Sequence, residues 1–553
     1  PVSLVAERIP QGGADGRARY SQPVDGGGRI AVLASADGER RMTSPVIWAV
    51  CASDSRGGAG LQAALAQAAL PDENGQVCQC RSIVTAVTAQ SSHGVRSVQA
   101  LPVSVVEAQW QAAMEDGQPD AILVGWLPPD SELIEWLVNQ LRWMSAPVIW
   151  DPVIQATGAG LPQAQASLRS LIACARVITP TREEACWLTG MNYATDADLA
   201  RGLQNAGAHT VLISGGDSDP MSEWVTDRVY SRVHPGEPET AVLSDFAVHQ
   251  KRLSGSAHGT GSHHSAAIAV ALARGERLYD ALLRGSVMAR AALKAGRDAG
   301  FPADHRQPYP NCIAAMPPAT GDDWPLVTPL DQLPVARVRR PPPLKDNELG
   351  LYALTDNLEH LESLLALPVD AIQWRVKDRD SEYRRQTLAA LNLCRKAGVP
   401  FWLNDDWRLA LEIFPDGVHL GQEDLCRADL DALRHAGIAF GTSNHTEWEI
   451  ARSRAMTPAY LAFGPVYPPL SKTLKYPPLG TSRLAVWSRR YRSWKQTCIG
   501  GIVPGNARQT AACGTGSLAV VTCLQPGADQ KNNADALISA LENLRSTPIS
   551  ESS

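Results

Sequence analysis

Short apolar runs that end in polar residues recur along the second half of the chain, and residues 400–424 show the pattern most clearly. Two apolar runs in this stretch are followed by acids, Asp405 after the first and Asp424 after the second. Between them, residues 406–413 carry apolar side chains at helical spacing. The order predicts a strand, a helix and a second parallel strand. Parallel strands place their carboxyl ends at one edge, so we expect Asp405 and Asp424 to converge there.

Two convergent carboxylates suit a hard cation such as Mg²⁺, and a bound Mg²⁺ in turn suits a phosphorylated ligand. The alternative is that these acids are solvated loop residues or helix caps, because Asp is a common N-cap residue. The strands on either side favour the metal-binding interpretation, because they also end in polar or glycine-rich sequence.

Eight apolar runs with this character lie between Gly350 and Leu544, and helical stretches separate nearly all of them. The runs are 350–356, 371–377, 400–405, 417–421, 439–445, 460–466, 497–502 and 517–522. Eight strand–helix units in about 200 residues is the count for a small TIM (β/α)8 barrel, whose active site lies at the carboxyl ends of the strands.

The run at 371–377 is unusual because it alternates Gln373, Arg375 and Lys377 on one face. In a barrel that face points inward, so three long polar side chains there need an anionic partner or a neighbouring acid. A purely structural polar layer is the alternative interpretation.

A different series of strands and helices begins at Pro45. Residues 45–70 combine an apolar strand, a Gly-rich turn and an amphipathic helix, and residues 256–275 form a Gly-rich turn before a long Ala-rich helix. Further apolar strands are expected at 82–90, 120–127, 146–153, 176–180 and 210–216. Helical patterns separate most of these strands, which predicts a parallel α/β domain.

The two series predict a two-domain chain, with an α/β domain at 45–301 and a barrel at 346–545. Residues 302–345 are rich in Pro, which indicates an interdomain linker. Residues 1–44 are rich in Gly, Arg and Asp without a sustained period, and we expect a disordered leader there. Residues 546–553 are expected to be a disordered tail.

Composition narrows the range of partners. The 553 residues carry a net charge of −6, with 44% hydrophobic and 20% charged residues, so no nucleic-acid or membrane surface is implied. No apolar run approaches the ~20 residues that span a bilayer. The eleven cysteines have no metal-binding spacing, which is typical of a reduced, cytoplasmic protein. We therefore expect small-molecule substrates as partners, and the sequence is compatible with either a monomer or a homo-oligomer.

Seven motifs in the second half occur in a recognisable order: QWRVK, NDD, GVHLGQED, GTSNH, GPVYPPLSK, IGGI and AVV. Together they resemble the thiamine phosphate synthase family over the whole 350–544 segment. In that family a pyrimidine diphosphate ionises with loss of Mg²⁺-bound pyrophosphate, and the nitrogen of a thiazole phosphate captures the resulting cation. The resemblance implies Mg²⁺ as cofactor and stabilisation of a leaving anion as the main task of the protein.

The resemblance also assigns roles by position. Asp405 and Asp424 would bind Mg²⁺, and Gln373 would contact the pyrimidine ring. The expected catalytic residues, which would hold the pyrophosphate, are Arg375, Lys377 and Lys472. Further diphosphate contacts would come from Asn404, Ser443 and Ser471, and the thiazole phosphate would be held by Gly501, Val521 and Thr522. One departure is visible, because the family's TxTK loop reads PLSK here at 469–472 and loses one hydroxyl.

Six motifs in the first half also occur in family order: ASDSRGGAGLQA, TAQSSHGV, WDPV, TPTREEA, SGG and HGTGSHHSAA. They resemble the ribokinase-like hydroxymethylpyrimidine phosphate kinases, and the absence of GxxxxGK[ST] excludes a P-loop kinase. The resemblance implies ATP as co-substrate, with Gly259 and Gly261 in a backbone N–H cradle for the transferred phosphoryl group. Gln90 would contact the pyrimidine and Glu184 would help to organise Mg²⁺.

The kinase motifs contain five departures. Ala64, Trp126, Thr181, Ser214 and Ser262 stand where the family has Asp, Met, Asn, Lys and Cys respectively. Ser262 occupies the position of the catalytic base, and a Ser hydroxyl is a poor base without a partner. One alternative is therefore that the first domain is a catalytically dead binding or assembly module. A second alternative makes the barrel a regulator that acts on thiazole tautomers, but the retention of both Asp405 and Asp424 argues against it.

Overall fold

A computed structural model describes residues 44–154, 165–216, 221–234, 239, 242–255, 257–299, 311–334, 349–468 and 476–545. The expected leader up to residue 43 and the expected tail at 546–553 lie outside the described residues. In the part of the chain that is described, no helix is long and apolar enough to cross a membrane.

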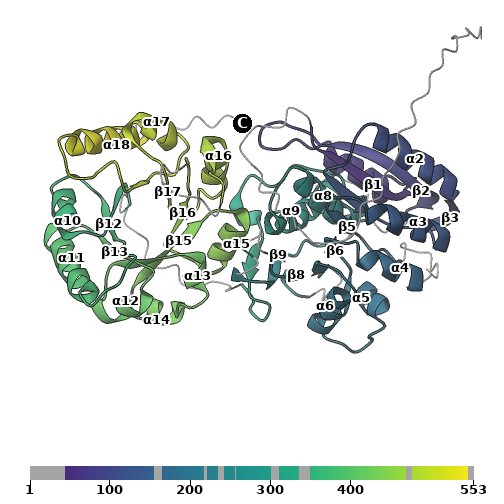
Figure 1. The fold of residues 1–553 in the computed structure, drawn as a ribbon, viewed down its shortest axis with the longest axis horizontal. Helices are drawn as coiled ribbons and strands as arrows, with labels where there is room; N and C mark the ends of the chain where they lie inside the picture. Colours follow the sequence, from purple (N-terminus) through teal and green to yellow (C-terminus); the bar gives the residue numbers. More distant parts are fainter. Residues whose placement is uncertain are drawn as a thin grey trace, which may run out of the picture. The chain divides into compact units, whose positions relative to one another are not determined.

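The first domain is built on a ten-stranded mixed sheet in the order β10-β9-β8-β7-β6-β5-β4-β1-β2-β3 (Figure 1). The strands are β1 (Val46–Ser53), β2 (Gln79–Ser91), β3 (Gly94–Ala100), β4 (Ala121–Val124), β5 (Val148–Trp150), β6 (Val177–Ile178), β7 (Thr210–Ile213), β8 (Trp224–Ser231), β9 (Asp245–Lys251) and β10 (Leu326–Thr328). The central strands from β2 to β7 are parallel, whereas β3, β8, β9 and β10 pair antiparallel with their neighbours. The expected parallel α/β domain is therefore correct for the centre of the sheet and incomplete at both edges.

Strand β1 shows why the central strands read as continuous apolar runs. Ile47, Ala49 and Cys51 belong to the hydrophobic core on one face of the sheet, and Trp48 and Val50 belong to the core on the other face. A strand that is buried on both faces needs apolar residues at every position. The helices around this sheet are α1 (Gly60–Ala68), α2 (Val103–Glu115), α3 (Ser131–Leu141), α4 (Gln165–Ile172), α5 (Arg182–Thr189), α6 (Asp196–Asn205), α8 (Thr260–Ala273) and α9 (Leu278–Asp298).

The proline-rich segment is not a linker along its whole length. Residues 311–334 are described, and within them β10 pairs antiparallel with β9 at the edge of the first sheet. Pro325 and Pro329 flank this strand without entering it, and an edge strand is where neighbouring prolines are tolerated in a sheet. The interpretation of 302–345 as unpacked linker is therefore wrong for 311–334, and its remaining parts lie outside the described residues.

The second half of the chain forms a closed barrel of eight parallel strands, β11 to β18, as the eight apolar runs predict (Figure 1). The strands are β11 (Leu351–Thr355), β12 (Ala371–Trp374), β13 (Phe401–Asn404), β14 (Gly417–Leu420), β15 (Ala439–Asn444), β16 (Tyr460–Phe463), β17 (Gln496–Ile499) and β18 (Leu518–Val520). The helices are α10 (Leu358–Leu365), α11 (Tyr383–Ala397), α12 (Trp407–Ile413), α13 (Gln422–Leu425), α14 (Leu430–His435), α15 (Glu447–Ala455), α16 (Gly480–Arg490), α17 (Pro504–Ala511) and α18 (Gln530–Arg545). The expected TIM (β/α)8 architecture is confirmed.

Candidate active sites

The carboxyl ends of neighbouring barrel strands bring most of the expected synthase residues to one rim. Arg375 directly follows β12, Asn404 is the last residue of β13, and Ser443 lies near the end of β15. Strands β12 to β15 are paired in parallel without interruption. Residues at their carboxyl ends therefore face the same end of the barrel.

Asp405 and Asp406 are adjacent in sequence but have different tasks. The side chain of Asp406 accepts the backbone N–H of Leu409 at 3.1 Å and caps α12. Asp405 instead adopts a left-handed backbone conformation with φ of 64°, and the amide of Asn404 donates to its carboxylate at 2.6 Å. The helix-cap interpretation is thus correct for Asp406 and does not describe Asp405.

Asp405 and Asp424 interact directly across the rim. Burial, the charge of Asp405 and the hydrogen bond to Asp405 together raise the pKa of Asp424 to about 6. Two carboxylates that raise each other's pKa in this way would be stabilised by a cation bound between them. The predicted convergence of these two acids is present in the structure.

This pair fits Mg²⁺ better than a transition metal. Its donors are carboxylate oxygens, which are the ligands that Mg²⁺ prefers. In the described ranges no group of three or more His, Cys, Asp or Glu side chains could hold a metal ion by itself. Mg²⁺ commonly takes one or two carboxylates and completes its coordination with water and substrate phosphate, so two acids are sufficient.

The expectation that Gln373, Arg375 and Lys377 share one inward strand face is only partly correct. Strand β12 ends at Trp374, so Gln373 is buried inside the barrel, Arg375 is half-buried beyond the strand, and Lys377 is exposed. The strand ends early because the chain turns away after the rim is reached. Only Gln373 therefore needs a partner in the barrel interior.

His419 is a buried rim residue that the sequence interpretation missed. Its Nε2 lies 2.8 Å from Ser443 Oγ, and its Nδ1 lies 2.7 Å from Tyr460 Oη. Burial and the charge of Arg375 lower the pKa of His419 to about 3, so the ring is neutral. The signal in the sequence was a lone His inside the apolar run at 417–421, which reads equally well as a core residue.

The loops after the last two strands hold the expected thiazole phosphate residues. Gly500 and Gly501 both have positive φ, at 104° and 66°, and follow β17 directly. Val521 and Thr522 are exposed after β18, which pairs with β17. Ser471 and Lys472 fall in the stretch 469–475, which lies outside the described residues.

The first domain contains a cavity of about 500 Å³. All of the expected kinase residues line it: Gln90, Glu184, Gly259, Gly261 and Ser262. Three of the divergent residues line it as well: Trp126, Thr181 and Ser214. Ala64, by contrast, is buried in the hydrophobic core and is not part of the cavity wall.

Helix α8 offers an anion site at its first turn. The backbone N–H groups of Gly261 and Ser262 donate to nothing in the described part of the chain, and both residues line the cavity. Free N–H groups at a helix N-terminus attract anions such as phosphate. Gly259 precedes them with φ of 93°, and a Cβ there would lie 1.8 Å from the carbonyl oxygen of Gly58, so only Gly fits.

The glycines of the first turn, in contrast, have structural partners. The N–H of Gly57 donates to the Asp54 carbonyl, and the N–H of Gly58 donates to the Asp54 carboxylate, both at 3.0 Å. The same carboxylate lies 2.9 Å from His258 Nε2. These glycines therefore shape the turn around Asp54 rather than present free N–H groups to a phosphate.

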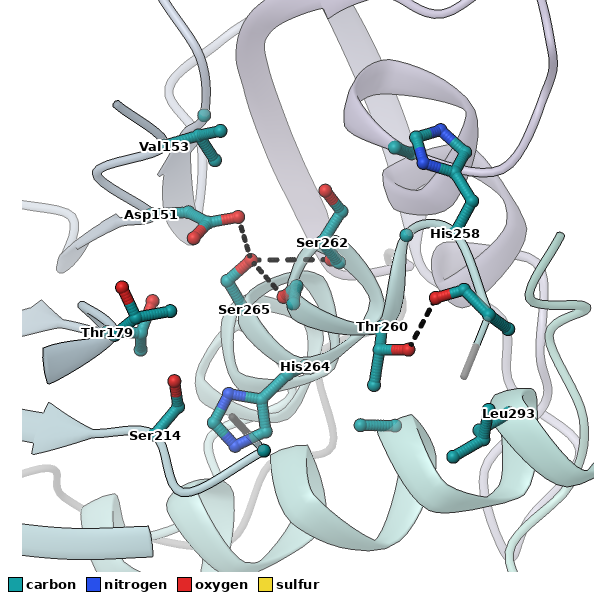
Figure 2. Close-up of a pocket in the computed structure, with 18 of the residues that line it drawn as sticks. Asp151, Val153, Thr179, Ser214, His258, Thr260, Ser262, His264, Ser265 and Leu293 are labelled. Atoms are coloured by element: carbon teal, nitrogen blue, oxygen red, sulfur yellow. Dashed lines mark hydrogen bonds between the residues drawn. The ribbon is translucent and has the colours of Figure 1, made fainter. Parts of the chain in front are cut away.

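An acid pair lies in the cavity wall beside α8. Asp151 follows β5, and burial together with the charge of Glu184 raises its pKa to about 7. Glu184 accepts the Thr181 N–H at 2.8 Å within the capping box that begins α5. Asp151 was missed as a metal candidate, although an acid at the end of a buried strand in the WDPV motif is a usable signal. Figure 2 shows the Ser265 hydroxyl, which donates to Asp151 at 3.2 Å, between this acid and the first turn of α8.

The two histidines after Ser262 leave it without a basic neighbour. His263 faces Gln67, with 2.8 Å between its Nδ1 and the Gln67 amide nitrogen. His264 points toward Ser214, and its Nε2 lies 3.4 Å from Ser286 Oγ (Figure 2). Adjacent helical residues point in different directions, so the two imidazoles bind Gln67 and Ser286 rather than Ser262.

Two family models match the chain. Residues 54–306 match the model for phosphomethylpyrimidine kinase, and residues 350–524 match the model for thiamine monophosphate synthase. The thiamine-phosphate synthase of Klebsiella pneumoniae is 39% identical over 191 residues, which is 34% of this chain and 90% of the relative. That of Escherichia coli O157:H7 is 40% identical over 182 residues, which is 33% of this chain and 86% of the relative.

A solved phosphomethylpyrimidine kinase of Clostridium difficile is 27% identical, with a TM-score of 0.35, over 44% of this chain and 96% of that protein. The kinase model and the cavity lie in the same part of the chain, and the synthase model and the acid pair lie in the barrel. By its barrel, the chain belongs to the thiamine-phosphate synthase family, and it carries ahead of that barrel a phosphomethylpyrimidine kinase domain.

Proposed function

We propose that the barrel joins hydroxymethylpyrimidine diphosphate to thiazole phosphate, with release of pyrophosphate and formation of thiamine phosphate. The observation that carries this proposal is the convergence of Asp405 and Asp424 at the strand ends. A regulator that acts on thiazole tautomers has no use for such a pair, because its chemistry releases no diphosphate.

In this reaction the bond between the pyrimidine methylene carbon and the diphosphate oxygen breaks, and a bond from the thiazole nitrogen to that carbon forms. Mg²⁺ bound to the acid pair would neutralise charge on the departing pyrophosphate. Arg375, Lys377 and Lys472 add positive charge or hydrogen bonds to the same anion, and Asn404, Ser443 and Ser471 orient it. Since a neutral ring nitrogen is the nucleophile, the barrel needs no side chain that attacks.

The remaining synthase residues position the two rings. Gln373 contacts the pyrimidine from the barrel interior. Gly501 follows β17 with positive φ, and Val521 and Thr522 follow β18, the strand paired with β17, so N–H groups of these loops hold the thiazole phosphate.

We propose a second function for the cavity of the first domain, which is ATP-dependent phosphorylation of the pyrimidine monophosphate. The free N–H groups at the first turn of α8 support it, with Gly259 and Gly261 shaping the cradle. Asp151 and Glu184, which lie in the cavity wall beside α8, provide oxygen ligands for Mg²⁺. Arg252 and Arg290 line the same cavity and supply the positive charge that Ser214 does not.

Ser262 favours the monophosphate over the free alcohol as substrate. A phosphate monoester is already an anion at pH 7, because its second pKa is about 6. Its oxygen can attack ATP without a general base, whereas the hydroxymethyl group must lose a proton. General-base assistance is worth roughly 10²–10⁴-fold, so its loss weakens alcohol phosphorylation selectively.

We also propose a cytoplasmic location, because all eleven cysteines are free thiols.

A paired assay of thiamine phosphate tests both functions. The barrel reaction requires the pyrimidine diphosphate, thiazole phosphate and Mg²⁺ without ATP. The coupled reaction starts from the pyrimidine monophosphate and requires ATP as well. Asp405→Asn should abolish product in both assays, whereas Gly261→Pro should abolish it only in the coupled assay. Product from the monophosphate in the Gly261→Pro variant would refute the backbone cradle at α8, and product without ATP in Asp405→Asn would refute Asp405 as a metal ligand. An unaltered protein that makes no product in the barrel assay would refute the synthase function, and one that makes none from the monophosphate with ATP would refute the kinase function.

A further inference from the structure

Five polar side chains form an unbroken line of hydrogen bonds through the barrel interior, which we call the relay. Gln373 Nε2 donates to Tyr352 Oη at 2.9 Å, and the hydroxyl oxygens of Tyr352 and Tyr460 are 3.0 Å apart. Tyr460 Oη is 2.7 Å from His419 Nδ1, and His419 Nε2 is 2.8 Å from Ser443 Oγ. The relay thus joins two rim residues that lie on strands β12 and β15.

The middle of the relay is sealed from solvent. Tyr352, Tyr460 and His419 are 1%, 0% and 8% exposed. Within the described ranges, the polar side-chain atoms of these three residues have no partners outside the relay. Each of its four links must therefore be made by a proton that the relay itself supplies, since a buried hydroxyl without a partner is costly.

The number of available protons determines which end of the relay, Gln373 or Ser443, donates a hydrogen bond into it. The two tyrosine hydroxyls and the neutral imidazole supply one proton each, which makes three protons for four links. His419 is buried, and its two ring nitrogens face the hydroxyl oxygens of Tyr460 and Ser443 rather than a carboxylate, so the imidazole is neutral and no second imidazole proton is available. The fourth proton must come from one end, either from the amide N–H of Gln373 or from the hydroxyl of Ser443.

The residue that donates the fourth proton determines the hydrogen-bonding state of both Gln373 and Ser443. If Gln373 donates inward, each member of the relay donates to the next in the direction of Ser443. The Ser443 hydroxyl then donates outside the relay, and the Gln373 carbonyl also faces outside it. If Ser443 donates inward, every link reverses, and the Gln373 NH₂ group faces outward instead. If neither end donates inward, one buried link lacks a proton, and if both do, one link holds two opposed protons.

We propose that the relay couples the diphosphate site to the ring site, so that an anion at Ser443 obliges Gln373 to accept a hydrogen bond from the substrate ring. The proposal rests on the proposed synthase function and deepens it, because it assigns Tyr352, Tyr460 and His419 as positioning residues. A diphosphate accepts hydrogen bonds, so its binding selects the state in which Ser443 donates. The outward carbonyl of Gln373 then fits a ring that carries an amino group and disfavours one that carries an oxo group at that place.

The structure holds the relay in the state expected for diphosphate binding, because the amide nitrogen of Gln373 lies on Tyr352. Tyr460 is the link whose loss breaks the relay with least change of shape. Its ring stacks on His419 with 5.7 Å between centroids and packs edge-on to Trp402, and Tyr460→Phe keeps both contacts. In this variant the Gln373 amide can turn without affecting Ser443.

The test compares two pyrimidine diphosphates, the 4-amino substrate and its 4-oxo analogue, by kcat/KM for coupling to thiazole phosphate. The wild type is expected to prefer the amino compound, and Tyr460→Phe should reduce that preference by about tenfold, the equivalent of one unsatisfied buried hydrogen bond (about 1.4 kcal/mol). Tyr352→Phe should have the same effect. The double variant should add nothing further, because the relay is already broken.

Tyr491→Phe is the matched control. It also removes a buried tyrosine hydroxyl from the barrel, but that hydroxyl donates to Glu447 at 3.0 Å and lies outside the relay. Its amino-to-oxo preference should equal that of the wild type, whatever its stability. A preference within twofold of the wild type in folded Tyr460→Phe and Tyr352→Phe would overturn the relay while leaving the synthase function intact. A wild type that makes no thiamine phosphate from the amino substrate would remove the synthase function and the inference with it.

Discussion

Replacing Asp405 by Asn should abolish synthesis and, in the absence of metal, stabilise the protein. The substitution preserves the local structure, because Asn tolerates the left-handed φ of 64° and its amide oxygen can still accept from Asn404. It removes the negative charge that, after burial, contributes most to raising the pKa of Asp424. Stability and activity should therefore change in opposite directions.

The size of the stability change follows from the pKa of Asp424. A rise from 3.8 to about 6 corresponds to ~3 kcal/mol of destabilisation at pH 8 if it is taken at face value. Asp424 is only half-buried and its burial remains in the variant, so solvent screening and the retained burial reduce the gain to about 1 kcal/mol. Such a change shifts the melting temperature of a domain of 150–250 residues by about 2–4 °C.

The sign depends on pH. Between pH 4 and 6 the folded protein holds a proton on Asp424 that the unfolded chain has released, so wild-type stability falls as pH rises through this window. Above pH 6 the penalty is complete. Asp405→Asn should reduce this slope, because burial of Asp424 remains in the variant, so its advantage should be absent at pH 4 and full at pH 8.

Thermal unfolding with EDTA at pH 4, 6 and 8 measures the stability effect, and thiamine phosphate formation measures activity. The rate should fall roughly a hundredfold or more, because metal stabilisation of a leaving group is worth several kcal/mol. Asp406→Asn is the matched control, since Asn caps helices as well as Asp does and should change neither property. A metal-free Asp405→Asn protein that melts below the wild type at pH 8, or that keeps a tenth of its activity, would refute the reasoning.

Further predictions concern the first domain. Ser262→Ala should leave ATP-dependent conversion of the monophosphate within about threefold, and Ser262→Cys should raise phosphorylation of the free alcohol by up to ~10²-fold; a large loss in Ser262→Ala would give this serine a role we have not identified. Asp151→Asn should lower kinase activity roughly a hundredfold with the barrel reaction unchanged, and equal kinase activity would remove Asp151 from the metal site. Gly259→Ala should abolish kinase activity, because its Cβ would overlap the Gly58 carbonyl oxygen, and an active variant would show that the turn can move.

The barrel could be predicted from sequence because its signal is repeated. Each strand is buried on both faces, so it appears as an apolar run, and each ends at the same rim, where polar residues such as Asp405 follow. The acid pair could be predicted for the same reason, because the carboxyl ends of parallel barrel strands all lie at one rim, which brings Asp405 and Asp424 to the same end of the barrel. These features depend on local pattern and topology rather than on the details of packing.

Features that depend on packing between distant segments could not be predicted. Strand β10 has three residues between prolines and gains its place only by pairing with β9, far away in the sequence. His419 reads as an ordinary core residue until Ser443 and Tyr460 are brought beside it. Gly57 and Gly58 appear in the sequence only as part of a Gly-rich turn, and the structure shows that Asp54 accepts hydrogen bonds from both of their N–H groups.

Two of the divergent residues in the first domain affect proton transfer and charge. Ser262 and Ser214 line the cavity and replace side chains that act on protons or supply charge, while the backbone N–H groups of Gly261 and Ser262 and the acids Asp151 and Glu184 are retained. Phosphoryl transfer depends mainly on positioning and electrostatics, which are the retained elements. A substrate that arrives already ionised needs only these. The pattern therefore fits an enzyme specialised for the second phosphorylation, whose product is the diphosphate that the barrel consumes. Loss of function without selection would not preserve the cradle and the acid pair together.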